Sequence, residues 1–279
     1  MQAFRWNLIV GLCLVGAAGL FPAFAADTQL SATAPEVTTI VNKMKAVFEP
    51  QKPRVATVTV TFTGGEGKKV EWKGREARTM MDEEKRTVLV MLEPADVKGT
   101  ALLVQERTDA TDQMWLYLPP IDRIRNIVPV ETYQQFLGSD FTYADLGFVD
   151  RHGQYRLLGP EQHKGKQAYK VELVPTEQWY YSRIITWVDA DTYLPLQRDF
   201  YDVANNLWRT ETFDQITVID GQPTPLRVEM KDLRQKTSTI FTMSAVQYNE
   251  QLPASLFDPL QLRLAAGRAP LALAAGEAQ

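Results

Sequence analysis

Residues 55–62, Val-Ala-Thr-Val-Thr-Val-Thr-Phe, decide the fold class. Every second residue from Ala56 to Phe62 is apolar, and threonines occupy the positions between them. Because successive side chains of a β-strand point to opposite faces of the sheet, this alternation predicts a half-buried strand.

Eleven further segments show strand patterns, and turn signals such as Asp220-Gly221 separate most of them. The segments are 69–80, 85–92, 100–106, 112–118, 154–158, 167–174, 180–189, 195–202, 207–219, 225–233 and 237–248. Parallel strands need long crossover connections, usually helices, and such helical patterns are missing. The sequence therefore predicts a mainly β fold, an antiparallel meander of about a dozen strands.

One amphipathic helix is expected near the N-terminus, over residues 34–48. Its apolar residues recur at spacings of three and four: Val37, Ile40, Val41, Met44, Val47 and Phe48. This stripe predicts a helix with one buried face. The helix either packs on the core or forms a movable lid over an apolar cavity, and the lid candidates are Ile40, Met44 and Val47.

Several of the expected strands are apolar on both faces, among them 87–92, 101–104 and 114–118. A sheet of this kind must be covered on both sides, and one helix covers only part of it. The remainder is a second sheet, a barrel interior or a cavity for an apolar ligand. Aromatic residues either fill this core or line the cavity, and the lining candidates are Trp72, Trp115, Tyr117, Trp187, Phe213 and Phe241.

The composition excludes several classes of function. The net charge is −4, which argues against nucleic acid as a partner. The chain has only His152, His163 and Cys13 as soft metal ligands, too few for a His/Cys zinc site. No nucleophile elbow and no phosphate-binding loop is present. We therefore expect no catalytic residue, no metal and no cofactor.

The stretch 119–150 is the longest irregular segment, and such segments are often functional. Asp140 and Asp145 in this stretch could serve acid–base chemistry, but turn and helix capping is the simpler interpretation. Thr142 and Asp145 have the spacing of a capping box. Arg123 and Arg125 stand two residues apart, and they either hold a phosphate or a partner's carboxylate or lie on a solvated strand face.

Residues 1–25 have the pattern of a secretory signal peptide. Arg5 precedes an uncharged, mostly apolar run of 13 residues from Leu8 to Leu20, which is short for a transmembrane helix. Ala23-Phe24-Ala25 supplies the cleavage pattern. We expect cleavage after Ala25, which removes Cys13 and leaves a chain without disulfides, as suits the periplasm of a Gram-negative bacterium.

Several strings of the sequence resemble the outer-membrane lipoprotein-sorting-like proteins, which are longer relatives of the periplasmic lipoprotein carrier in the LolA/LolB-like superfamily. The strings are P-A-D-V-K-G-T-A-L-L-V at 94–104, M-W-L-Y-L-P-P-I-D-R-I-R at 114–125, F-L-G-S-D-F-T-Y-A-D-L at 136–146, W-V-D-A-D-T-Y-L-P-L-Q-R-D-F-Y-D at 187–202 and L-P-A-S-L-F at 252–257. The resemblance covers nearly all of 34–260. The motif loop consists of Gly138, Ser139, Asp140, Phe141, Asp145 and Leu146.

The resemblance implies an incomplete antiparallel β-barrel wrapped around the N-terminal helix, with an apolar cavity open to acyl chains. The expected order is a signal peptide over 1–25, a leader over 26–33, one LolA-like domain over 34–264 and a disordered, alanine-rich tail over 265–279. The implied function is periplasmic binding or shuttling of lipid or lipoprotein acyl chains between the inner and outer membranes.

The expected partners are a lipid or an acylated lipoprotein, with transient membrane contact and a monomeric state. The alternative function is an envelope sensor or interaction module that docks on a lipoprotein or on a membrane transporter. A remote alternative is a hydrolase that uses the loop 138–145.

Overall fold

The structure, a computed structural model, describes residues 35–48, 52–107, 112–146, 153–176, 179–248 and 251–267. These residues all belong to one compact unit. The expected signal peptide and leader lie outside the described residues, as does His152. Among the described residues, no helix is both long enough and apolar enough to cross a membrane.

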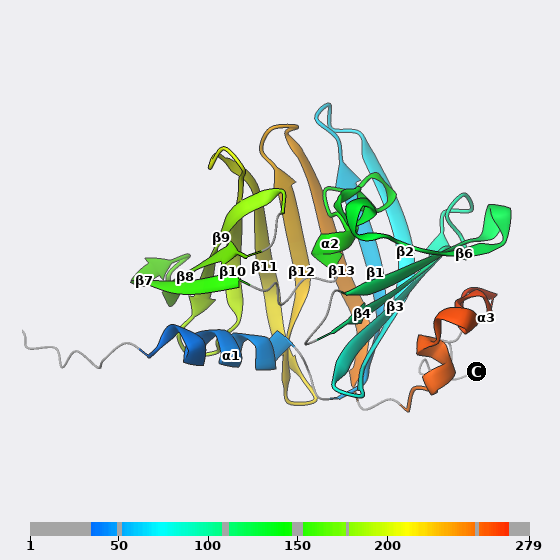
Figure 1. Ribbon diagram of the computed structural model, residues 1–279, viewed down its shortest axis with the longest axis horizontal. Coiled ribbons are helices and arrows are strands. Elements are labelled where there is room, and N and C mark those ends of the chain that lie inside the picture. The colour runs from blue at the N-terminus through cyan, green and yellow to red at the C-terminus, as the bar shows by residue number, and fades with distance from the viewer. Residues whose placement is uncertain are drawn as a thin grey trace, which may run out of the picture. The chain divides into compact units, whose positions relative to one another are not determined.

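Thirteen strands of the described chain form a single open antiparallel sheet, which is not closed into a barrel (Figure 1). The strands are β1 (Arg54–Thr63), β2 (Lys69–Met81), β3 (Glu84–Glu93), β4 (Ala101–Glu106), β5 (Gln113–Leu118), β6 (Arg123–Asn126), β7 (Gly153–His163), β8 (Lys166–Pro175), β9 (Tyr181–Asp189), β10 (Pro195–Asp202), β11 (Leu207–Ile219), β12 (Gln222–Asp232) and β13 (Thr237–Tyr248). The predicted mainly β, antiparallel fold is confirmed. Only β6 was not predicted, because a strand of four residues is too short to show an alternation.

The sheet consists of two meanders that meet in its middle. One runs from β1 to β6 and the other from β7 to β13, and the pairing of β1 with β13 joins them. In this pairing Val58 lies opposite Met243, and Val60 lies opposite Phe241. The first and the last of the described strands, β1 and β13, are therefore neighbours in the centre of the sheet.

Helical segments are short and lie between or beside the strands. They are α1 (Val37–Phe48), η1 (Pro119–Ile121), η2 (Pro129–Tyr133), η3 (Phe136–Gly138), α2 (Tyr143–Leu146), η4 (Ala254–Phe257), η5 (Pro259–Gln261) and α3 (Leu262–Gly267). The stripe of α1 packs on one end of the sheet, where Ile40, Val41 and Met44 form a buried cluster with Val171 of β8 and Val188 of β9. The helix also contacts β7.

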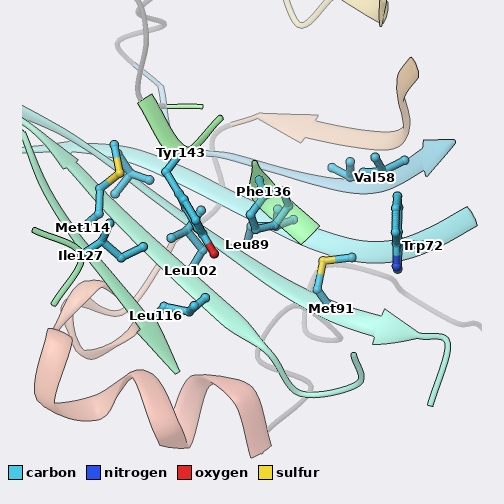
Figure 2. Close-up of a cluster of buried hydrophobic side chains, with 12 residues drawn as sticks. Val58, Trp72, Leu89, Met91, Leu102, Met114, Leu116, Ile127, Phe136 and Tyr143 are labelled. Carbon is cyan, nitrogen blue, oxygen red and sulfur yellow. The ribbon is translucent and has the colours of Figure 1, made fainter. Parts of the chain in front are cut away.

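The face of the sheet that carries Val58 and Leu89 is called the inner face, and the opposite face the outer face. The segment 127–146 covers the inner face of β3 to β5 (Figure 2). Phe136 and Tyr143 project from this segment toward the strands, and their rings meet edge to face at 5.7 Å. They pack with a cluster of buried strand residues: Val58, Val60, Trp72, Leu89, Met91, Leu102, Val104, Met114 and Leu116.

The C-terminal segment covers the outer face of the same strands. Leu256 and Phe257 of η4 are buried against Val88, Val90 and Leu103. We call the buried cluster to which these residues belong the outer-face cluster. The turn that contains Leu256 and Phe257 therefore packs onto the sheet. The strands that are apolar on both faces are thus explained, since one irregular segment covers each face.

The expected disordered tail over 265–279 is wrong for its first residues. Helix α3 runs to Gly267, and Ala265 in this helix is only 5% exposed and belongs to the outer-face cluster. Alanine has the highest helix propensity, and the sheet offers an apolar surface against which a short helix can form. Residues 268–279 lie outside the described residues.

Candidate functional site

A cavity of about 160 Å³ lies on the inner face of the sheet. Residues from β1 to β4 and from β10 to β13 line the same space, so the sheet curves around it. Most of the lining is apolar: Val47, Val58, Leu89, Leu102, Val104, Phe141, Leu146, Leu194, Phe213, Pro223, Pro225, Val228, Phe241 and Met243. Such a surface favours an apolar ligand, because each methylene group that leaves water contributes about 0.8 kcal/mol.

Strand alternation places the apolar lining. Phe241 and Met243 are two residues apart on β13 and therefore share a face, and Val228 of β12 lies directly opposite Phe241. The ring of Phe141 meets that of Phe241 edge to face, with 4.7 Å between centroids. The cavity wall thus joins the central strands to the motif loop.

Charged residues of β1 to β4 line one part of the cavity: Arg54, Glu76, Arg78, Lys85 and Glu106. We call these five residues the charged cluster. Arg54 forms an ion pair with Glu76, and Lys85 contacts Glu106 at 2.6 Å. Arg78 approaches Glu76 at 3.8 Å. The side chains of Arg54 and Lys85 are only 5% and 3% exposed, so these charges are held away from solvent.

The two carboxyl groups of the charged cluster differ in their protonation. Burial raises the pKa of Glu106 to about 7, although the neighbouring Lys85 opposes this shift. Burial acts on Glu76 in the same direction, but the charges of Arg54 and Arg78 outweigh it and lower the pKa of Glu76 to about 2. Glu76 is therefore ionised at neutral pH, whereas Glu106 is partly protonated.

A second buried ion pair lines the cavity from the other meander. Arg198 of β10 donates to Glu211 of β11 at 3.1 Å. Burial raises the pKa of Glu211 to about 7, and the charge of Asp145 adds to this shift. The polar part of the lining therefore contains a second carboxyl group that titrates near neutral pH.

The motif loop is anchored by buried polar contacts. The carboxylate of Asp140 accepts hydrogen bonds from the hydroxyls of Thr237 and Thr239, and the Asp140 backbone N–H donates to Thr239 Oγ1 at 2.8 Å. Ser139 is fully buried, and its hydroxyl donates to the carbonyl of Phe141 at 3.2 Å. Gly138 has a φ of +76°, a conformation that glycine adopts without strain. These contacts hold the Phe141 side chain in the cavity wall.

Asp145 caps the short helix α2, as its spacing from Thr142 predicted. Its carboxylate accepts from the Thr142 backbone N–H at 2.8 Å, and the Asp145 N–H donates to the Thr142 hydroxyl at 3.2 Å. Asp145 also pairs with Arg209 of β11 at 3.5 Å and accepts from the hydroxyl of Tyr180 at 3.2 Å. The structure thus gives Asp145 a position in a buried polar network in addition to the cap.

The six aromatic candidates for the cavity lining lie in different places. Phe213 and Phe241 line the cavity. Trp72 is buried in the inner-face cluster, outside the set of lining residues. Trp115 and Tyr117 pack with the outer-face cluster under the C-terminal segment. Trp187 belongs to a separate cluster with Ile185 and Leu196, and its ring stacks on His163 at 4.6 Å.

The three lid candidates and the two arginines of β6 lie in different parts of the structure. Ile40 and Met44 are buried against β8 and β9, whereas Val47 lines the cavity. Arg123 and Arg125 lie exposed on the edge strand β6, and Arg125 pairs with Glu131 at 2.8 Å. None of these arginines is among the residues that line the cavity.

The charged cluster was not among the sites predicted from the sequence. The sequence feature that could have revealed it is a charged residue at a strand position where the alternation predicts a side chain on the inner face. Arg54 has the parity of Ala56 and Val58 on β1, and Lys85 has the parity of Leu89 on β3. Within one strand such a charged residue is not unusual, since the ends of strands often carry charges. Only pairing of the four strands collects the charges in one place.

Comparisons with known proteins agree with this fold. A domain of an outer membrane lipoprotein-sorting protein from Vibrio parahaemolyticus has 24% identity and a TM-score of 0.77 over 81% of this chain and 97% of that chain. A DUF1329 family protein from Desulfovibrio piger has 26% identity and a TM-score of 0.76 over 81% and 98%. A LolA superfamily protein from Nitrosomonas europaea has 20% identity and a TM-score of 0.65 over 81% and 98%.

No protein with a curated description matches the sequence significantly. A protein-family model with the description "Uncharacterized protein" matches residues 83–263, which is well over half of the chain. The expected resemblance to the lipoprotein-sorting-like proteins is confirmed by the structural neighbours. The chain belongs to the family of this model, and its fold is that of the outer-membrane lipoprotein-sorting and LolA superfamily proteins.

Proposed function

We propose that this protein binds a lipid, or the acyl chains of a lipoprotein, in the inner-face cavity and carries them through the periplasm between the inner and outer membranes. The observation that carries the proposal is the apolar lining of the cavity, to which Val58, Phe213 and Phe241 contribute from different strands. An acyl chain fits this surface chemically, and a carrier of this kind needs no catalytic group.

The energetics favour such a ligand. A long acyl chain that leaves water gains on the order of 10 kcal/mol, since each methylene contributes about 0.8 kcal/mol. Loss of motional freedom on binding offsets part of this gain. The difference between these two terms sets the affinity, and a shuttle between two membranes requires binding that is stable but reversible.

Two further observations support the proposal. A structural neighbour is described as an outer membrane lipoprotein-sorting protein domain. Residues 1–25 have the pattern of a signal peptide, and no cysteine follows Cys13. Fractionation of cells and N-terminal sequencing test the location, since a periplasmic protein that starts at Ala26 agrees with it, and an intact N-terminus in the membrane pellet contradicts it.

Native mass spectrometry of the protein purified from the periplasm tests the binding. The wild-type protein should carry a non-covalent lipid mass. Val228→Glu places a charge in the cavity wall and should remove this mass. Val218→Glu is the matched control, because Val218 on β11 is 68% exposed, and it should keep the lipid.

The result is informative if both variants melt within a few degrees of the wild-type protein. Wild-type protein that carries no lipid, or lipid that both variants retain equally, contradicts the proposal. A bound envelope protein in place of lipid would favour the interaction module. Release of a cleaved lipid product would favour the hydrolase.

A further inference from the structure

The charged cluster contains more cationic than anionic side chains. Its cations are Arg54, Arg78 and Lys85, and its carboxyl groups are those of Glu76 and Glu106. Glu76 is shared between two arginines, since Arg54 is bonded to it and Arg78 lies 3.8 Å away. Even with both carboxylates ionised, one positive charge in the wall of the cavity has no anionic counterpart within the cluster.

Two guanidinium donors of the cluster are also unused. The Nε groups of Arg54 and Arg78 are buried and have no hydrogen-bond partner among the described residues. Arg54 is 5% exposed, so its charge is held in the protein rather than in bulk solvent. An excess positive charge held inside a protein is costly. An anion in the cavity would offset this excess charge.

The charged cluster adjoins the apolar lining along the same strands. Arg54 and Val58 are four residues apart on one face of β1, which corresponds to about 13 Å. Lys85 and Leu89 have the same separation on β3, and both line the cavity. A ligand that contacts both parts must therefore have an anionic end and an apolar chain.

We propose that the charged cluster is a headgroup site for an anionic amphiphile, in which Arg54 and Arg78 bind a carboxylate or phosphate headgroup while the acyl chain lies on the apolar lining. This inference rests on the proposed function, and it adds the charge of the ligand and the residues that select it. Lys85 supports the site as the third cation of the cluster.

Two roles can be separated within the cluster. Glu76 is bonded to Arg54 and orients that guanidinium, so removal of Glu76 or Arg54 breaks a buried pair. Arg78 makes only the longer contact to Glu76, and its side chain is 18% exposed. Arg78 is therefore the residue whose replacement removes a headgroup contact with the smallest disturbance of the fold.

The test is isothermal titration of the mature protein, freed of co-purified lipid, with four dodecyl compounds that differ only in their headgroup. They are dodecanoate, dodecyl phosphate, 1-dodecanol and dodecyltrimethylammonium. The two anionic compounds should bind about tenfold more tightly than the alcohol, as a charged hydrogen bond predicts. The cationic compound should bind most weakly. This series uses the wild-type protein, so it does not depend on the folding of a variant.

Arg78→Gln should weaken dodecanoate binding about tenfold and leave 1-dodecanol binding within about twofold. Arg75→Gln is the matched control, because Arg75 has the opposite parity on β2 and does not line the cavity. It should change neither affinity. Melting temperatures of both variants report whether the fold is intact.

The outcomes separate the headgroup site from the proposed function. If none of the dodecyl compounds binds, the proposed function fails and the headgroup site with it. If the alcohol binds as tightly as dodecanoate, the proposed function stands and the headgroup site is overturned. If acetate or inorganic phosphate binds as tightly as the amphiphiles, the cluster takes free anions, and the headgroup assignment is likewise overturned.

Discussion

The hydroxyl of Thr239 donates to the carboxylate of Asp140 at 2.8 Å, and both residues are fully buried although 99 positions separate them. This contact ties the motif loop to β13 in the middle of the sheet. It also explains why the loop can hold Phe141 in the cavity wall, since the residue before it cannot move without breaking buried hydrogen bonds.

Replacement of Asp140 by alanine should lower the free energy of unfolding by about 2–4 kcal/mol, because the buried hydroxyls of Thr237 and Thr239 lose their hydrogen-bond acceptor. Ser139→Ala should cost only about 1 kcal/mol, since the Ser139 hydroxyl bonds only within the loop. Denaturant unfolding measures both. Equal losses for the two variants would show that the anchor to β13 contributes little.

Replacement of Trp115 by glutamate should lower the stability by about 1–3 kcal/mol, because the partly buried Trp115 packs against the outer-face cluster and glutamate loses this apolar contact. Ligand affinity of the folded fraction should remain, since Trp115 does not line the cavity. Thermal unfolding and ligand titration at low temperature separate the two effects. A stable variant that no longer binds lipid would place Trp115 in the binding surface instead.

Deletion of residues 252–279 should expose the apolar outer face, including Val88 and Leu103, and cause aggregation or binding of a hydrophobic dye. Deletion of residues 268–279 is the control, because it keeps η4, η5 and α3. Size-exclusion chromatography and dye fluorescence give the comparison. Two equally soluble, dye-negative proteins would mean that the C-terminal segment is not needed to cover the sheet.

Stability should fall as the pH rises from about 5 to about 7. The pKa values of Glu106 and Glu211 are raised from 4.5 to about 7 in the folded protein. In this window the folded chain holds protons that the unfolded chain has released, so raising the pH favours unfolding. This stabilisation is fully present below the pKa of the unfolded chain, 4.5, and is lost as the pH rises through the pKa of the folded protein, about 7.

Melting temperatures at fixed ionic strength between pH 5 and 7 measure this effect. Glu211→Gln should show a flatter profile than the wild-type protein, because glutamine does not titrate. Glu161 is the control position, since its pKa is lowered by the hydrogen bond from Trp187 and it stays ionised throughout. A wild-type melting temperature that rises with pH over this range would contradict the assignment.

Local periodicity made much of the fold predictable. The alternation in β1 and the apolar stripe of α1 are visible within about a dozen residues, because side-chain direction repeats every second residue in a strand and every three to four in a helix. The capping box of Thr142 and Asp145 is equally local and was predicted correctly. The absence of long helical patterns was sufficient to exclude a parallel sheet.

The expected lining was less predictable. Trp115 and Phe241 have the same appearance in the sequence, an aromatic residue in an alternating strand, yet one packs on the outer face and the other lines the cavity. Alternation distinguishes two faces of a strand but does not say which face the curved sheet encloses. That choice depends on which segments cover each face.

By itself, the sequence determined every described strand except β6, the antiparallel order of these strands and the need for cover on both faces, because each of these follows from residues that are neighbours in the chain. Only the tertiary structure decided that β1 pairs with β13, that the segment 127–146 covers one face and the C-terminal segment the other, and that the charged cluster gathers beside the apolar lining. These features depend on contacts between residues far apart in the chain, and their free energy comes from shared burial that no single strand reveals.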